Sequence, residues 1–187
     1  MRTGSIETIL ENQNITIDLQ FFHKDDMSIL SDIYRKWVEL SDILQSSGGR
    51  RINIPEILSE GVFCYHFDSG RTLGGNSKIN MSFDCLKLNP VSRVQVKSCS
   101  VISDLTSFGP RSVWDELYFV HFFPNRSYDG SYEIYEVPNR LVYNHKVNKN
   151  QTFQQQQELN RRPRFSLIDE IIRPNNIQPV IAASLFS

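Results

Sequence analysis

Two short segments near the middle of the 187-residue chain constrain its fold most strongly. Residues 78–88 alternate apolar and polar side chains, and residues 93–101 do the same with a high content of valine. Alternation with a period of two is typical of a strand that buries one face. The Asn89-Pro90 pair between the segments is typical of a turn. We therefore expect two neighbouring antiparallel strands joined by a short connection.

Helical periodicity precedes this strand pair. Apolar residues recur at intervals of three and four from Asp26 to Gln45, with Asp25 or Asp26 as the expected N-cap. A shorter helix is expected from near Asn53, with Pro55 in its first turn. Further predicted elements are strands at 15–22, 117–123 and 132–137, and helices at 151–160 and 165–172, the last ended by Pro174. This order predicts an α/β or α+β domain with a central mixed β-sheet flanked by helices.

Composition narrows the class of protein. The apolar fraction of 40% is enough for a core, which excludes a wholly disordered chain. No run of 18 apolar residues exists, so we expect no membrane span, and the polar N-terminus has no apolar secretory core. The three cysteines, Cys64, Cys85 and Cys99, lack metal-site spacing and suggest reduced thiols. These features favour a cytoplasmic protein.

The net charge of −1 conceals a gradient along the chain. Residues 1–47 carry four basic and eight acidic residues, whereas residues 140–173 carry seven basic and three acidic ones. A basic C-terminal third suits a protein that presents one face to a polyanion. A solvated charged helix would have the same composition, so charge alone leaves both interpretations open.

Three polar side chains on the two central strands are the strongest candidates for chemistry. Alternation places Gln95 and Lys97 on the same side of their strand, beside Asp84 of the neighbouring strand. An unpaired charge buried on a sheet face is costly, so these groups should pair or face water. A divalent cation held against a phosphodiester would explain the set. Asp84, Gln95 and the Val96 carbonyl would ligate Mg²⁺, and Lys97 would orient or help deprotonate the attacking water.

The same residues resemble a known nuclease signature. Asp84, followed after ten residues by Gln95-Val96-Lys97, resembles the PD-(D/E)XK motif, with Phe83 in place of the usual proline. Motifs spread over about residues 30–175 resemble the Type II restriction endonucleases of the Bsp type; they are Ile52-Asn53-Ile54-Pro55-Glu56, Ser59-Glu60-Gly61, 104–110, Trp114-Asp115-Glu116, 143–149 and 161–166.

The resemblance implies a fold and an activity. The fold would be a single restriction-endonuclease-like domain, with an N-terminal extension (1–25), a catalytic core (26–139) and a DNA-contacting part (140–175). The activity would be Mg²⁺-dependent cleavage of double-stranded DNA at the interrupted palindrome GCNGC within a prokaryotic restriction-modification system. A palindromic target implies a homodimer with one active site per strand.

One position departs from the family pattern. Gln95 stands where the superfamily usually has a carboxylate, and a neutral amide binds Mg²⁺ more weakly. Glu60 on the preceding helix could supply the missing charge, with Glu56 as the less favoured donor. The alternative is that Glu60 is a solvated acid that interacts with the helix dipole.

Candidate DNA contacts lie after this site in the chain. Arginines could bind phosphates or read guanine through paired hydrogen bonds, and asparagines could contact base edges or backbone. The candidates are Ser107, Lys146, Asn148, Lys149, Arg161, Arg162 and Arg164, with Asp104, Thr106, Arg111, Asn144 and Asn150 as further possibilities. A solvated basic loop, an Asn-rich turn or a capped loop would use the same residue types.

Other interpretations remain. The protein could be a repair or structure-specific nuclease of the same fold, or a DNA-binding protein that has lost catalysis at Gln95. An HNH site at Asn144-His145 is disfavoured, because no second His or Asn lies at a useful spacing. Trp37 and Trp114 are expected in the core or at an interface.

Overall fold

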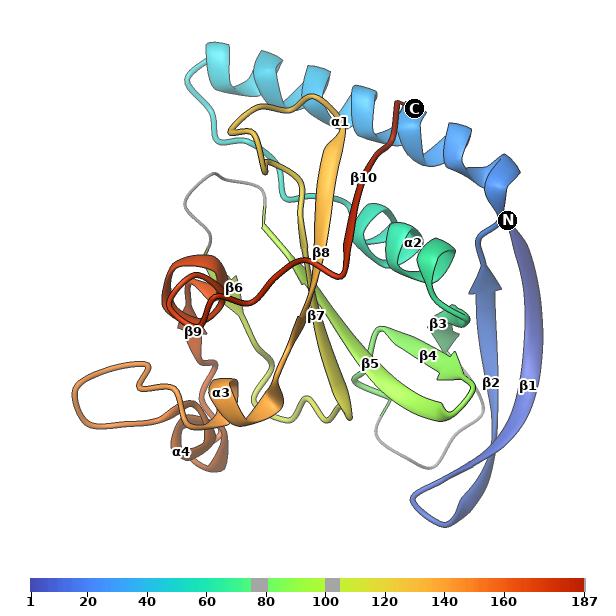
Figure 1. Cartoon of the computed structure of the whole chain (residues 1–187), viewed down its shortest axis with the longest axis vertical. Coiled ribbons are helices and arrows are strands. Elements are labelled where there is room, and N and C mark those ends of the chain that lie inside the picture. Colours follow the sequence, from blue (N-terminus) through green and yellow to red (C-terminus); the bar gives the residue numbers. More distant parts are fainter. Residues whose placement is uncertain (75–80, 100–104, 187) are drawn as a thin grey trace.

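The computed structural model describes residues 1–74, 81–99 and 105–186, and its centre is an eight-stranded mixed sheet (Figure 1). The strand order is β1-β2-β3-β4-β5-β7-β8-β10, and every described pair is antiparallel except the parallel pair β5–β7. The strands span β1 Arg2–Leu10, β2 Gln13–Phe21, β3 Ser69–Gly74, β4 Cys85–Leu88, β5 Val91–Ser98, β7 Glu116–His121, β8 Ser131–Val137 and β10 Ile181–Ser184. The predicted mixed sheet is confirmed.

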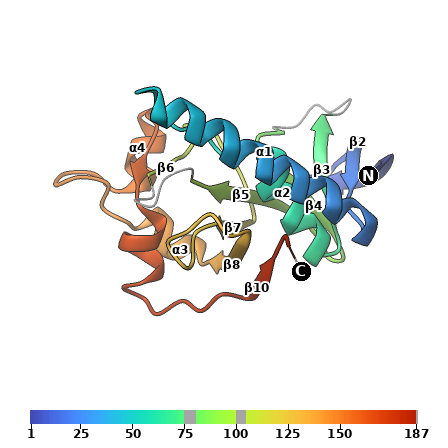
Figure 2. The same ribbon diagram turned by 90° about the horizontal axis from the view of Figure 1, so that it is seen from above.

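Helices cover both faces of the sheet. On one face, α1 (Met27–Ser46) and α2 (Glu56–His66) pack against residues that include Val94 and Val96 of β5. On the other face, α3 (Asn139–Tyr143), α4 (Phe153–Glu158) and the π-helix η2 (Ile168–Ile172) enclose a second cluster with Leu117 and Phe119 of β7. Figure 2 shows α1 and α3 on opposite sides of β5 and β7. A short ribbon of β6 (Thr106–Ser107) and β9 (Arg164–Phe165) lies beside this second cluster.

The predicted strand pair is confirmed as β4 and β5. The two strands are antiparallel, with Cys85 opposite Val94 and Leu88 opposite Val91 across the turn at Asn89-Pro90. The first predicted segment is longer than β4, because Asp84 precedes the strand and residues 78–80 lie outside the described part. Residues 100 and 101, at the end of the second predicted segment, also lie outside it.

The predicted long helix is also confirmed, but its cap differs from the expectation. Asp26 stands at the N-cap position of α1 without a side-chain capping bond. Its carboxylate instead accepts a hydrogen bond from the His23 backbone N–H at 2.9 Å and pairs with the N-terminal amine of Met1. The carboxylate therefore closes the 3-10 turn η1 (Lys24–Asp26) and ties the chain terminus to the start of α1.

Several elements differ from the expectations at the two ends of the chain. Strand β1 was not predicted, and it pairs along its whole length with β2. The helix expected over 165–172 is shorter, because Phe165 belongs to β9 and helical structure begins at Ile168. Both tryptophans are buried as expected, with Trp37 at 3% and Trp114 at 4% exposure.

A glycine brings α2 close to its neighbours. A Cβ atom at Gly61 would lie 3.0 Å from Leu30 Cδ2 of α1 and 3.0 Å from Cε1 of Phe22, which follows β2. Contacts this short are tighter than a Cβ atom normally makes, so Leu30 or Phe22 would have to shift by a few tenths of an ångström for any other residue type. Gly61 thus allows α2 to lie against α1 and β2, which sets the depth of the adjacent Glu60.

Within residues 1–74, 81–99 and 105–186, no helix has both the length and the apolar character needed to cross a bilayer.

Candidate active site

The backbone of Asp84 is fixed between two strands. Its N–H donates to the Val94 carbonyl of β5, and its carbonyl accepts from the Thr72 N–H of β3, both at 2.9 Å. Its side chain then turns along β5, where Oδ2 accepts a hydrogen bond from the Val96 N–H at 2.9 Å and another from Gln95 Nε2. Neighbouring strands therefore hold this carboxylate in one orientation.

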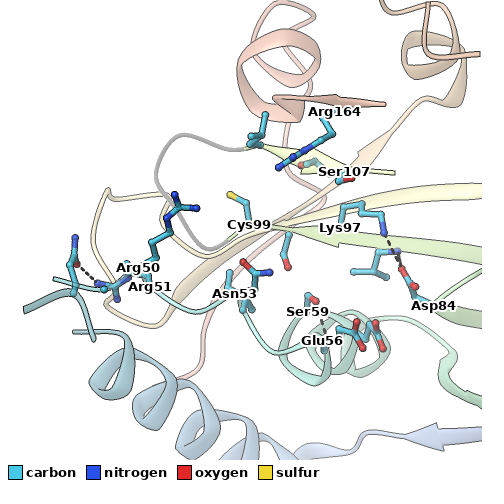
Figure 3. Close-up of a pocket in the computed structure, with 18 residues that line it drawn as sticks. Arg50, Arg51, Asn53, Glu56, Ser59, Asp84, Lys97, Cys99, Ser107 and Arg164 are labelled. Carbon is cyan, nitrogen blue, oxygen red and sulfur yellow. Dashed lines mark hydrogen bonds and ion pairs between the residues drawn. The ribbon is translucent and has the colours of Figure 1, made fainter. Parts of the chain in front are cut away.

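Lys97 lies on the same side of β5 as Gln95 and completes the group. Its Nζ is 3.9 Å from Oδ2 of Asp84 and 5.9 Å from the ring centre of Phe108, and Figure 3 shows it directed toward the carboxylate. The structure thus brings together the carboxylate, the amide and the ammonium group that the sequence places on these two strands. Val94 and Val96 lie on the opposite side of β5, in the cluster with residues of α1 and α2.

The side-chain oxygen of Gln95 accepts no hydrogen bond from the described residues. The residue is 2% exposed, and its Oε1 has no hydrogen-bond partner among the described residues. A buried acceptor without a donor is costly, so this oxygen suits a cation. The described residues contain no group of three or more His, Cys, Asp and Glu side chains suited to a metal. A metal held here would therefore depend on the amide oxygen and a main-chain carbonyl in addition to Asp84.

Glu60 is buried and ion-paired. The residue is 7% exposed, and its Oε2 accepts a hydrogen bond from Arg71 Nε of β3 at 2.5 Å. The alternative of a solvated acid is wrong for Glu60, because α2 presses this position against the sheet. Glu56 fits that description, with 82% of its side chain exposed and 3.9 Å between its Oε2 and Arg71 Nη2. Arg71 was missed in the sequence, since its short strand shows no periodic pattern.

The carboxyls of buried Glu60 and of half-buried Asp84 are both harder to ionise than usual. Burial raises the pKa of Glu60 to about 8, and the neighbouring Asp84 adds to the rise, although Arg71 opposes it. Burial also raises the pKa of Asp84, whereas Lys97 and the hydrogen bonds from Val96 and Gln95 lower it. A further positive charge between the two carboxyls would favour the ionised form of both. The carboxyl chemistry therefore fits a divalent cation.

Glu60, Asp84, Val96 and Lys97 line a cavity of about 830 Å³, whereas Gln95 lies behind them and is not part of its lining. Its walls come from α2, the end of β5, the β6–β9 ribbon and the segment that joins α1 to α2 (Figure 3). The charged residues that line it are Glu56, Glu60 and Asp84 on the acidic side and Arg50, Arg51, Lys97 and Arg164 on the basic side. A cavity lined by both signs of charge suits an anionic ligand that binds together with a cation.

The predicted DNA contacts divide into two groups. Ser107 and Arg164 lie opposite each other on β6 and β9 and line the cavity. The others are exposed outside its lining, on or beside the loops that flank α4; they are Lys146, Asn148, Lys149, Arg161 and Arg162. Asn148 accepts a hydrogen bond from the Asn150 N–H at 2.9 Å, so it also serves the turn that an Asn-rich loop would form. Asp104 lies outside the described residues.

Comparison with known proteins gives one family. The family model described as Bsp6I restriction endonuclease matches residues 22–174, which leaves only β1 and β2 and the C-terminal segment outside. The Type II restriction enzyme Bsp6I of Bacillus sp. (strain RFL6) is 34% identical over 177 residues, which cover 89% of this chain and 94% of the relative. No solved structure matches.

The Arg71–Glu60 pair provides a test of the buried geometry. At about pH 9, above the pKa of about 8 that Glu60 has beside Arg71, we expect Arg71→Met to lower the free energy of unfolding by about 3 kcal/mol, because it leaves a buried carboxylate without its partner. The double variant Arg71→Met/Glu60→Gln should recover more than half of that loss. Urea denaturation of both variants and of Glu60→Gln measures the coupling.

The exposed pair Arg173–Asp169 is the matched control, since its side chains are 61% and 50% exposed. Arg173→Met should cost less than about 1 kcal/mol. Additive losses from Arg71→Met and Glu60→Gln would show that the two side chains do not interact in solution.

Proposed function

This chain belongs to the Bsp6I restriction endonuclease family, and we propose that it is a Type II enzyme that hydrolyses phosphodiester bonds in double-stranded DNA at GCNGC. The observation that carries the chemistry is the Asp84 carboxylate, which accepts hydrogen bonds from Gln95 and from Val96 N–H beside the Lys97 ammonium. The target sequence rests on the family motifs in the sequence. Asp84 and Gln95-Val96-Lys97 would form the PD-(D/E)XK-type motif.

The proposed cofactor is Mg²⁺. Asp84, the unpartnered Oε1 of Gln95 and the main-chain carbonyl of Val96 would hold it, since Mg²⁺ prefers hard oxygen ligands. Glu60 would add a further carboxylate oxygen, because the hydrogen bond from Arg71 Nε engages Oε2. When bound, such an ion offsets the negative charge that develops on the phosphate and makes a water molecule more acidic.

Lys97 and Asp84 have separate roles in the proposed hydrolysis. The water oxygen forms the new bond to phosphorus while the bond to the leaving oxygen breaks, and the proton lost by the water balances the one gained by the leaving group. Lys97 Nζ would donate to a phosphate oxygen and to the water, which orients attack and stabilises the anionic transition state. Asp84, whose Oδ2 is 3.9 Å from Nζ, would hold this ammonium group in place.

We also propose that the enzyme acts as a homodimer. GCNGC has two-fold symmetry, so two identical subunits would present one active site to each strand. Sedimentation of the protein on a duplex with one GCNGC site should therefore give the mass of two 21.7-kDa chains per duplex.

Mapping of DNA ends tests the proposed activity. Plasmid DNA incubated with the protein and Mg²⁺ should give discrete fragments whose ends all lie at GCNGC, and chelation of divalent metal should stop cleavage. Smears or nicks at DNA junctions would indicate a repair or structure-specific nuclease instead. Binding without cleavage under every divalent metal would indicate a catalytically inactive DNA-binding protein.

Substitution of the central groups tests the assignment of the site. We expect Asp84→Ala and Lys97→Ala each to lower the single-turnover cleavage rate by about 1,000-fold, because both act on the charge that forms at the phosphate. Binding of cognate duplex in Ca²⁺ should stay within about threefold of wild type for Lys97→Ala, since one contact among many is lost.

Lys36→Ala on α1 is the control, because this lysine is exposed and does not line the cavity. It should cleave at the wild-type rate. A near-wild-type rate for Lys97→Ala would reject β5 as the catalytic strand.

A further inference from the structure

We propose that Arg50 and Arg164 form a second phosphate site in the cavity, which holds a DNA backbone phosphate other than the one being cut, and that Arg51 positions Arg50. This inference rests on the proposed function, because it takes duplex DNA as the ligand. It assigns roles to Arg50 and Arg51, which precede every motif that suggested DNA binding in the sequence.

Charge in the cavity is separated in space. The carboxyls of Glu60 and Asp84 lie on the side of α2 and β4, where Lys97 also points (Figure 3). Arg50 enters from the segment between α1 and α2, and Arg164 enters from β9 across the cavity. Figure 3 shows both guanidinium groups directed toward the space between these walls. A DNA strand that places one phosphate at the carboxyls would continue between the two arginines.

Both arginines are available for an anion. Arg50 and Arg164 are exposed, and neither forms an ion pair with an acidic residue among residues 1–74, 81–99 and 105–186. The planar guanidinium group presents paired N–H donors that match phosphate oxygens. Ser107, opposite Arg164 in the ribbon, adds a hydroxyl donor to the same wall.

Arg51 also lines the cavity but is mostly buried and ion-paired through Nη1, whereas its Nε and Nη2 are buried without a hydrogen-bond partner among the described residues. Its Nη1 donates to Asp42 of α1 at 2.5 Å and to Gln45 at 3.1 Å, and its guanidinium carbon lies 4.0 Å from the ring centre of Tyr128. Only 10% of its side chain is exposed. Arg51 therefore clamps the connecting segment between α1 and the loop before β8.

A second contact holds the same segment. Trp37 Nε1 of α1 donates to the Ile52 carbonyl at 3.2 Å, and the Trp37 ring is itself buried. Arg51 and Ile52, which follow Arg50, are thus both bound to α1. Before Arg50, α1 itself ends at Ser46. A phosphate-binding side chain on a fixed backbone loses less conformational freedom when it binds.

The test uses the full chain with Ca²⁺ in place of Mg²⁺ and labelled duplexes with or without GCNGC. We expect Arg50→Gln and Arg164→Gln each to weaken binding to both duplexes by a similar factor of about ten. The slope of log affinity against log salt should decrease in magnitude by up to about 0.9 in each single variant and by about 0.9 in the double variant, which loses the whole phosphate contact. Because both arginines hold the same phosphate, the double variant should weaken binding by less than the product of the single effects.

Arg2→Gln is the matched control, since Arg2 is exposed on the edge strand β1 and does not line the cavity. It should change neither affinity nor slope. In an Arg51→Met background, Arg50→Gln should have little further effect on the salt slope, whereas Arg164→Gln should keep most of its effect. A purely structural role for Arg51 would leave both second substitutions with their full effects, which would overturn the positioning role.

The outcomes separate this inference from the proposed function. An unchanged slope and affinity for Arg50→Gln, in a protein that cuts at GCNGC, would overturn the phosphate site alone. A loss confined to the GCNGC duplex would also overturn it, because it would identify a base contact. A wild-type protein that neither binds nor cuts duplex DNA would instead refute the function on which the site depends.

Discussion

The orientation of one carboxylate governs the rest of the site. Asp84 stands at the junction of β3, β4 and β5, where its backbone is bonded on both sides and its Oδ2 receives two N–H donors from β5. Burial raises the pKa of Asp84, and Lys97 and the two donors oppose that rise in part. The catalytic proposal depends on this balance, since a carboxylate free to rotate or permanently protonated would neither ligate a cation nor hold a lysine.

The charged residues around Asp84 are arranged in an acidic side and a basic side of the cavity. Glu60 lies on a helix that packs tightly against α1 and Phe22 at Gly61, where the missing side chain leaves room for that contact, and Arg71 partly offsets the charge of Glu60. The arginines on the far side of the cavity are separated from these carboxyls by Lys97 and the open space. A polyanion can therefore be held by the basic side while one of its phosphates reaches the acidic side. A site of a single sign would either repel DNA or bind it without a place for a cation.

Local patterns in the sequence were sufficient for part of this structure. Alternation predicted the β4–β5 pair and the shared face of Gln95 and Lys97, because side-chain direction in a strand depends only on the parity of the position. Helical periodicity predicted α1 for a similar reason. Strand β1 was not predicted, since most of its residues are exposed on both faces and no buried side imposes a pattern.

Arg71 and Arg51 could not be found from the sequence for another reason. Arg71 and Glu60 are eleven positions apart, and their contact exists only because β3 returns beside α2 after the intervening turn. Arg51 meets Tyr128 across 77 positions for a comparable reason, as the loop before β8 folds over the end of α1. Contacts between such distant positions come from the packing of the whole sheet, and neither residue type nor local spacing reports them. Asp26 stands at the predicted N-cap position, but its side chain makes no capping bond to α1, because the N-terminal amine and His23 N–H occupy its carboxylate.

The most direct test is the location of a bound divalent ion. Crystals soaked in Mn²⁺, measured at the manganese absorption edge, should show an anomalous peak in contact with the Asp84 carboxylate, Gln95 Oε1 and the Val96 carbonyl, and Asp84→Asn should remove or strongly weaken it. Manganese bound only elsewhere, or a Gln95 amide oxygen that stays out of contact with any ion at saturating metal, would contradict the account.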